Sequence, residues 1–351
     1  MSNTMTRPQT YRFHLEFRSL QDAQVRGDIS LTEIDFAHAV EAALFDGLRR
    51  SRFTRYEVPR AGVRLEPRFY KAKSGLSLCV GFAVILPTPD GGEHRVDCGL
   101  QWFRSRAERV IADMVLDTAV LPSVVLFQLA AYPDDGVQPY RRHDGIVLEA
   151  NPLAVPIQPG SRRELGPAVA WDGLCSEDLP VFIPRRVLED ALTEARSTPD
   201  HEVGGVLLGH LRRDTGDDEL FLEVTCHVPA QATETAATSI TFTADTWDHA
   251  RRVADLRGEG EIFVGWVHSH PFLLPDPVPE PLPVECVNDI LFFSDDDRFV
   301  MEQAFARPFL VALQTAVDSR LERALGHLPL RLYGWRDGEV VPRGFQVIEG
   351  R

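Results

Sequence analysis

The chain has 351 residues, which is enough for two ordinary domains. Its 44% hydrophobic and 25% charged residues are typical of a soluble globular protein. A net charge of −15 argues against nonspecific binding to nucleic acid or to anionic membranes.

The five cysteines are widely spaced and form no Cys-x-x-Cys pair. This pattern disfavours both a disulfide framework and an all-cysteine zinc site, so free thiols are expected. The N-terminal sequence lacks the apolar core of a signal peptide, and no apolar run reaches the roughly 20 residues that span a bilayer. We therefore expect a cytoplasmic protein with no membrane partner and no nucleic-acid partner.

The N-terminal half has the pattern of an α+β domain. Ser30-Leu31-Thr32-Glu33 resembles a capping box and precedes an amphipathic stretch, which predicts a helix over residues 31–50. Thr88-Pro89-Asp90-Gly91-Gly92 lies between two apolar runs and predicts a β-hairpin. No catalytic constellation is visible in this half. Strands are predicted at 10–18, 76–87, 94–104 and 124–132, and a second helix is predicted at 105–118.

Residues 133–178 are polar and rich in proline and glycine, which is typical of a linker. We predict an N-terminal α+β domain of unknown role over residues 1–155, a linker over 156–178, and a second domain over 179–351.

The second domain alternates apolar strands with amphipathic helices, which favours a mixed sheet flanked by helices and an α/β fold class. Pro184 can begin a helix, and the residues after it place five apolar side chains on one face. These are Val187, Leu188, Ala191, Leu192 and Ala195. Apolar strands are predicted at 201–211, 220–230 and 261–271, and a helix is predicted to follow Thr243 as N-cap.

A pair of histidines, His268 and His270, lies on the predicted strand 261–271. Side chains at i and i+2 of a strand point to the same face. Asp297, arriving from a later segment, would supply a third ligand. Two histidines and one carboxylate leave one position of a tetrahedral zinc ion open, as in catalytic sites. Bound zinc would activate a water molecule and polarise a carbonyl oxygen. Glu202 could carry the proton of that water to the leaving amine. Ser294 could donate a hydrogen bond to the oxyanion of the tetrahedral intermediate.

Each of these features alone has an ordinary structural interpretation. Two histidines at i and i+2 are weak evidence by themselves. Ser294-x-x-Asp297 also fits the capping box of the helix that follows, and Glu202 could be an edge-strand carboxylate. The order of the features along the chain is what favours a catalytic site.

In that order the features resemble the JAMM (MPN+, Mov34/JAB-type) zinc metalloprotease family. The resemblance covers about residues 179–345, and the N-terminal half has no recognised relative. The matching residues are Glu202, His268, His270, Pro271, Ser294 and Asp297.

The resemblance implies that His268, His270 and Asp297 bind Zn²⁺, that Glu202 is the acid/base, and that Ser294 supports the oxyanion. Ser269 also matches, without a role. It further implies cleavage of peptide or isopeptide bonds at the C-terminus of ubiquitin or a ubiquitin-like protein.

The sequence departs from the family in the long, proline-rich insertion between Pro271 and Ser294, residues 272–293. A stiff arm of this kind could form a rim or lid that shapes recognition of a modifier tail, or it could loop outward. Cys286 within it could occupy the open metal position and keep the enzyme latent.

The leading functional hypothesis is a deubiquitinase-like zinc isopeptidase. Only Lys71 and Lys73 are lysines among 37 basic residues, which is typical of a GC-rich, bacterial genome. The substrate would then be a ubiquitin-like protein or its conjugate in a bacterial conjugation or antiviral system, with conjugation-system proteins as further partners. Two alternatives stay open: C-terminal processing of a sulfur-carrier-like β-grasp protein, and a non-catalytic MPN-type scaffold.

Overall fold

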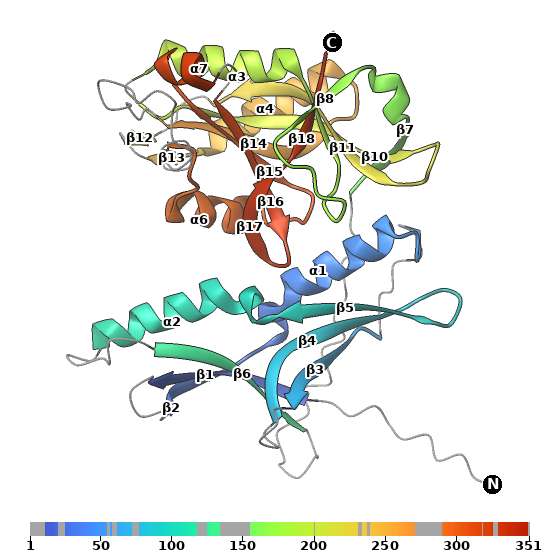
Figure 1. Cartoon of the computed structure of the whole chain (residues 1–351), viewed down its shortest axis with the longest axis vertical. Helices are drawn as coiled ribbons and strands as arrows, with labels where there is room; N and C mark the ends of the chain where they lie inside the picture. Colours follow the sequence, from blue (N-terminus) through green and yellow to red (C-terminus); the bar gives the residue numbers. More distant parts are fainter. Residues whose placement is uncertain are drawn as a thin grey trace. The chain divides into compact units, whose positions relative to one another are not determined.

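The structure is a computed structural model of the chain (Figure 1). The described residues are 11–19, 25–54, 57, 62–71, 77–117, 125–133, 155–199, 201–230, 234–236, 239–270, 290–317, 319–325 and 329–349. The chain divides into two compact units, Met1–Ala154 with Asp337–Glu339, and Val155–Arg336 with Val340–Arg351. The limits of the predicted domains stay a prediction.

Among its described residues, the N-terminal unit has two three-stranded sheets and two α-helices, which confirms its α+β character (Figure 1). One sheet has the order β2-β1-β6 and the other β3-β4-β5. Phe36 of the first helix lies at the centre of the core, with its ring centroid 5.0 Å from that of Phe82 and 5.2 Å from that of Phe13. The elements are β1 (Tyr11–Ser19), β2 (Val25–Ser30), α1 (Glu33–Arg49), β3 (Arg64–Lys71), β4 (Ser77–Pro87), β5 (Glu93–Gly99), α2 (Arg104–Asp117) and β6 (Val125–Pro133).

Two local predictions in this unit meet different outcomes. The predicted hairpin is confirmed, because β4 and β5 pair antiparallel on either side of residues 88–92. The helix starts two residues later than the predicted capping box. Its N-cap is Thr32, and the Thr32 backbone N–H donates to Asp35 Oδ2 at 2.7 Å. Ser30 instead ends β2, where it pairs with His14.

The C-terminal unit is built on one large mixed sheet with helices packed against it, as expected. Its strand order is β17-β16-β15-β14-β10-β11-β9-β18-β8, and β7 pairs with β10. The strands are β7 (Ile157–Gly160), β8 (Ala168–Trp171), β9 (Val181–Pro184), β10 (Gly204–Asp214), β11 (Leu220–Pro229), β14 (Ile262–His270), β15 (Val311–Ala316), β16 (Leu330–Arg336), β17 (Glu339–Arg343) and β18 (Phe345–Ile348). The helices are α3 (Arg185–Ser197), α4 (Ala244–Arg257), α6 (Asp295–Ala304) and α7 (Ser319–Leu325).

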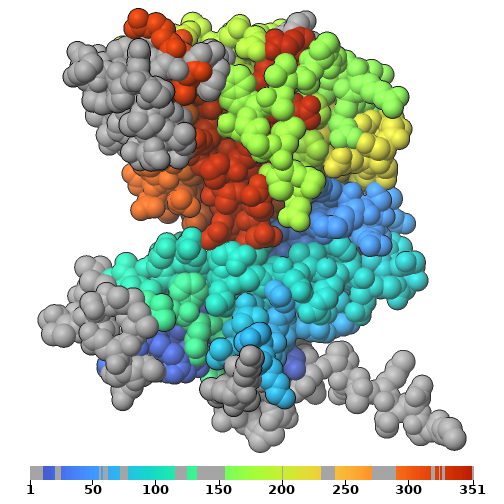
Figure 2. All heavy atoms as spheres, in the orientation of Figure 1, coloured from blue at the N-terminus to red at the C-terminus, as the bar shows by residue number. Residues whose placement is uncertain are grey.

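The sequence predicts a linker over residues 156–178, and the structure has two short strands in this stretch. These are β7 and β8, which pair with β10 and β18, so this stretch belongs to the large sheet. Figure 2 shows its side chains (light green) lying against those of the last strands (red) on the surface of this unit, and Trp171 Nε1 donates to the Leu330 carbonyl at 3.4 Å. The strands are only four residues long, too short for periodicity to distinguish them from a polar loop.

Other elements of this unit follow the sequence closely. All five apolar residues predicted on one face of α3 are buried, and Pro184 is its N-cap. Thr243 is the N-cap of α4. The short strand β12 (Glu234–Ala236) pairs antiparallel with β13 (Ser239–Thr241). No helix among the described residues is long and apolar enough to cross a membrane.

Candidate metal centre

Strand β14 carries both histidines and lies inside the sheet, between β10 and β15. Its last seven residues, Val264–His270, are buried, because β10 and β15 cover its edges and helices pack on the sheet. Burial of both faces explains why this strand reads as a nearly continuous apolar run that ends in polar residues. His268 is 0% and His270 2% exposed.

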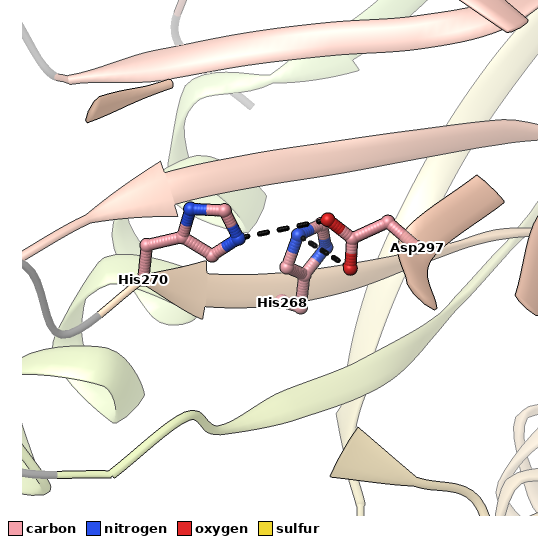
Figure 3. Close-up of side chains that lie close together, drawn as sticks. All are labelled: His268, His270 and Asp297. Carbon is pink, nitrogen blue, oxygen red and sulfur yellow. Dashed lines mark ion pairs between the residues drawn. The ribbon is translucent and has the colours of Figure 1, made fainter. Parts of the chain in front are cut away.

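Asp297 comes from the first turn of α6 and points at both imidazoles (Figure 3). Its Oδ1 lies 3.3 Å from His268 Nε2, and its Oδ2 lies 3.7 Å from His270 Nε2. One ligand atom from each of the three residues lies within 4.8 Å of the others. The three side chains thus form a buried group that could hold a metal ion, and no other such group is present among the described residues.

The ionisation states of Asp297 and His268 suit a metal. Burial alone would raise the pKa of Asp297, but its electrostatic interaction with the neighbouring imidazoles of His268 and His270, together with the hydrogen bond from the Ser294 backbone, holds it well below its usual range. Burial lowers the pKa of His268 and so favours the neutral imidazole. A carboxylate with two neutral imidazoles is the donor set of many zinc sites.

The hydrogen bonding of His268 supports this fit. Neither of its ring nitrogens has a hydrogen-bond partner among the described residues, although the side chain is fully buried. An unsatisfied buried polar atom costs about 1–3 kcal/mol, and a metal ion would satisfy Nε2. The imidazole is stacked on Trp266, with ring centroids 4.5 Å apart and an interplanar angle of 17°, which fixes its orientation.

Ser294 is the N-cap of α6 and forms a reciprocal capping box with Asp297. The Asp297 N–H donates to Ser294 Oγ at 3.1 Å, and the Ser294 N–H donates to Asp297 Oδ2 at 2.8 Å. Ser294 and Asp297 therefore do form the helix capping box that their spacing predicts. The same bonds place Asp297 against the histidines, so capping and a metal-binding role are compatible.

Glu202 lies just before β10, beside the strand of the two histidines. Gly204 pairs with His268 in the antiparallel register of β10 and β14, and continuing that register places Glu202 opposite His270. The side chain is 5% exposed, and its burial raises the pKa to about 7, with His270 opposing this rise and Asp297 adding to it. The structure therefore brings Glu202 to the edge of the group.

Sequence reasoning missed several side chains around this group. Ser269, assigned no role, accepts a hydrogen bond from the Val203 N–H through its Oγ at 3.0 Å. Gln314, on β15, lies 2.6 Å from His270 Nδ1 through its Nε2. No motif marks Gln314, because it reaches the site only through the parallel pairing of β14 and β15. Residues 272–289 of the proline-rich insertion, with Cys286, lie outside the described residues.

Comparison with known proteins adds a family assignment for part of the chain. Residues 178–279 match the model of the JAB1/Mov34/MPN/PAD-1 ubiquitin protease family. The match includes Glu202 and both histidines and ends inside the insertion, before Ser294 and Asp297.

No curated protein matches the chain. Among solved structures, a solution structure of a protein from Desulfitobacterium hafniense is similar over 49% of this chain and 93% of that chain, with 22% sequence identity and a TM-score of 0.30. The family match leaves the N-terminal region unassigned. The C-terminal half contains a JAB/MPN domain at residues 178–279.

Proposed function

We propose that the C-terminal unit is a zinc-dependent isopeptidase or peptidase that cleaves at the C-terminus of a ubiquitin-like protein. The observation that carries this proposal is the convergence of His268, His270 and Asp297 from β14 and α6 into one buried group. The JAB/MPN match, which contains both histidines, supports the reaction class.

His268, His270 and Asp297 would hold the zinc ion. When bound, zinc supplies Lewis acidity for a carbonyl oxygen and a water that is deprotonated near neutral pH. Asp297 is held in its ionised form and both histidines are buried, so the ligands need little reorganisation to bind.

Glu202 would accept the proton of the attacking water and pass it to the leaving amine. Hydrolysis consumes one water: its oxygen bonds to the carbonyl carbon, the C–N bond breaks, and the leaving nitrogen takes the proton. A group that both accepts and donates is most effective with a pKa close to the working pH. Burial raises the pKa of Glu202 to about 7, which suits both steps.

Ser294 would donate a hydrogen bond to the oxyanion of the tetrahedral intermediate. Its Oγ accepts from the Asp297 N–H, which leaves the hydroxyl hydrogen to donate elsewhere. The residue is half-buried, so a substrate could reach the hydroxyl while the cap keeps it in place.

Two other functions use the same residues differently. Trimming of a C-terminally extended, sulfur-carrier-like β-grasp protein needs the same chemistry on a linear peptide bond. A scaffold would bind its partner without turnover. The isopeptidase proposal is favoured by the family match to ubiquitin proteases. The scarcity of lysine is typical of a bacterial genome, and we propose a bacterial conjugation or antiviral system as the setting, with conjugation-system proteins as partners.

One assay separates these functions. Zinc-loaded protein and its Glu202→Ala variant are incubated with a ubiquitin-like protein joined to a lysine side chain and with the same protein carrying a C-terminal extension. If the unsubstituted chain cleaves the conjugate and Glu202→Ala does not, the isopeptidase is supported. If the unsubstituted chain cleaves only the C-terminal extension, the processing enzyme is supported. Zinc binding with neither cleavage favours the scaffold and contradicts the proposal.

A further inference from the structure

Strand β16 holds the helix that carries Asp297. Three of its residues at alternate positions, Arg331, Tyr333 and Trp335, share one face of the strand, because side chains alternate along a strand. Each of them donates a hydrogen bond to a main-chain carbonyl beside one end of α6. The sequence gives no signal for this role, since β16 and α6 are separate segments of the chain.

At the N-terminal end of α6, the acceptor is the carbonyl of Leu291, which comes shortly before the N-cap Ser294. Tyr333 Oη donates to this carbonyl, and Arg331 Nη1 donates to it at 3.2 Å. Leu291 is 2% and Tyr333 4% exposed, so water has little access to the bond between them. Burial also raises the pKa of Tyr333, which keeps the hydroxyl protonated and able to donate.

The ring of Tyr333 makes a second contact with the same segment. It stacks on Phe293, with ring centroids 4.5 Å apart and an interplanar angle of 27°. Phe293 in turn lies edge-on to His268, with ring centroids 5.9 Å apart. The hydroxyl and the ring of Tyr333 together hold the backbone that leads directly into Ser294, and so they fix where the first turn of α6 begins.

At the C-terminal end of α6, the acceptor is the carbonyl of the C-cap residue, Phe305. It accepts a hydrogen bond from Trp335 Nε1 at 2.9 Å. At about 1.5 Å of rise per residue, this contact lies about 12 Å along the helix from Asp297. The two ends of α6 are therefore held by the same strand, and only the N-terminal contact is close to Asp297.

The position of the first turn matters because Asp297 reaches across to a different strand. Its carboxylate oxygens lie 3.3 Å from His268 Nε2 and 3.7 Å from His270 Nε2, both on β14. A metal site requires ligand distances within about 0.2 Å of their ideal values. A small shift of the first turn of α6 would therefore weaken metal binding, even with all three ligands present.

We propose that Tyr333 and Arg331 are positioning residues of the candidate metal centre, and that metal binding is energetically coupled to β16 through their hold on the Leu291 carbonyl. This inference rests on the proposed zinc site. With the carbonyl held, the first turn of α6 presents Asp297 to the two histidines before a metal binds. Because coupling is reciprocal, a bound metal should in turn stabilise β16.

Zinc affinity of the full chain, measured by competition with a chromophoric chelator, tests the hold on Asp297. Arg331→Leu/Tyr333→Phe removes both donors and keeps the aromatic ring. We expect it to bind zinc about 10-fold more weakly, the lower end of the loss typical for an outer-shell partner. Trp335→Phe is the matched control, because it removes a hydrogen bond from the same strand to the opposite end of the same helix. It should bind zinc as tightly as the unsubstituted chain, and equal affinities of the two variants would overturn the proposal.

The single variant Tyr333→Phe guards against a double variant that does not fold. It keeps Arg331 as a donor to the Leu291 carbonyl, so its zinc affinity should lie between those of the double variant and the unsubstituted chain. If the double variant is unfolded, an unchanged affinity of Tyr333→Phe would overturn the proposal.

Hydrogen exchange with and without zinc provides a readout that a general loss of stability would not change. In the unsubstituted chain, zinc should slow exchange of the β16 amides more than that of the β8 amides at the far end of the same sheet, because a ligand protects the elements coupled to it. In Arg331→Leu/Tyr333→Phe this extra protection of β16 should disappear, while that of β14 remains. Equal extra protection of β16 in both proteins would overturn the proposal.

These measurements also separate the inference from the proposed function. If the unsubstituted chain binds no zinc, the proposed function fails and the inference fails with it. If the unsubstituted chain binds zinc and the double variant binds it equally well, the metal centre stands and only the hold by β16 fails.

Discussion

Ser269 and Val203 are joined by two hydrogen bonds. The Val203 N–H donates to Ser269 Oγ at 3.0 Å, and the Ser269 N–H donates to the Val203 carbonyl at 2.8 Å. Because Ser269 lies between the two histidines and Val203 follows Glu202, this pair fixes the proposed acid/base relative to the metal ligands. The serine of the His-Ser-His sequence thus has a positioning role that its spacing alone does not reveal.

Replacing Ser269 tests this role. Ser269→Ala leaves the Val203 N–H without its side-chain acceptor, which should lower the free energy of unfolding by about 1–3 kcal/mol. Turnover should fall while zinc stoichiometry stays at the unsubstituted level, and Ser269→Thr, which keeps the hydroxyl, should retain both. Unchanged turnover in Ser269→Ala would show that Glu202 is held by other contacts.

Glu202→Gln should remove the proton carrier without removing the metal. General acid–base groups contribute about 10²–10⁴-fold, so kcat should fall by that factor while bound zinc is retained. Burial raises the pKa of Glu202 to about 7, and only the carboxylate can accept a proton. The kcat/KM of the unsubstituted enzyme should therefore decrease as pH falls from about 8 to about 6. A flat profile over this range would contradict the assignment.

Asp297→Asn and Asp296→Asn form a matched pair in the first turn of α6. Asp297 is buried against both histidines, whereas Asp296 is exposed and outside the ligand group. Asp297→Asn should weaken zinc binding by more than the ~10–100-fold typical for loss of an outer-shell partner, so it should lose its zinc on dialysis. Asp296→Asn should keep the zinc content of the unsubstituted chain. Equal loss in both would indicate a different ligand register.

Ser294 has two proposed roles that different substitutions separate. Ser294→Ala removes the cap of α6 and should cost about 1 kcal/mol of unfolding free energy, whereas Ser294→Asn retains a capping acceptor and should cost little. Both variants lose the hydroxyl donor, so both should turn over substrate more slowly. Full activity of Ser294→Asn would leave Ser294 as a helix cap alone.

A half-buried glutamate beside a buried histidine, both outside the site, predicts the pH dependence of stability. Glu194 Oε2 on α3 lies 3.2 Å from His227 Nε2 on β11. Burial raises the pKa of Glu194 to about 7. A carboxyl group with a raised folded-state pKa stabilises the fold below its unfolded pKa, and this contribution is lost as pH rises through about 7. Glu194→Gln cannot ionise, so its unfolding free energy relative to the unsubstituted chain should increase between about pH 5 and pH 8. Parallel stability curves from urea unfolding would refute this.

The sequence predicted best those elements in which local pattern and tertiary burial agree. The apolar face of α3 and the Asp-Gly turn between β4 and β5 are examples, because helical spacing and turn chemistry act within a few residues. The two histidines of the candidate ligand group were predicted for the same reason, because alternation on a strand determines the face of His268 and His270. Asp297 was predicted from its place in the family motif.

What the sequence concealed depends on pairing between distant segments. Strands β7 and β8 resemble linker because their place in the sheet comes from β10 and β18, not from their own four residues. Gln314 reaches His270 only because β15 lies parallel to β14, 44 residues later in the chain. A single sequence carries no signal for such neighbours.

The indole of Trp266 makes metal binding at the candidate metal centre observable by tryptophan fluorescence. It is fully shielded from solvent, stacks on His268, and donates from Nε1 to Met301 Sδ at 3.2 Å, so its emission reflects a fixed local environment. A paramagnetic ion such as cobalt or copper bound by His268 would quench this fluorescence through the stacked ring. Occupancy of the centre can therefore be followed by light alone, before any substrate is in hand.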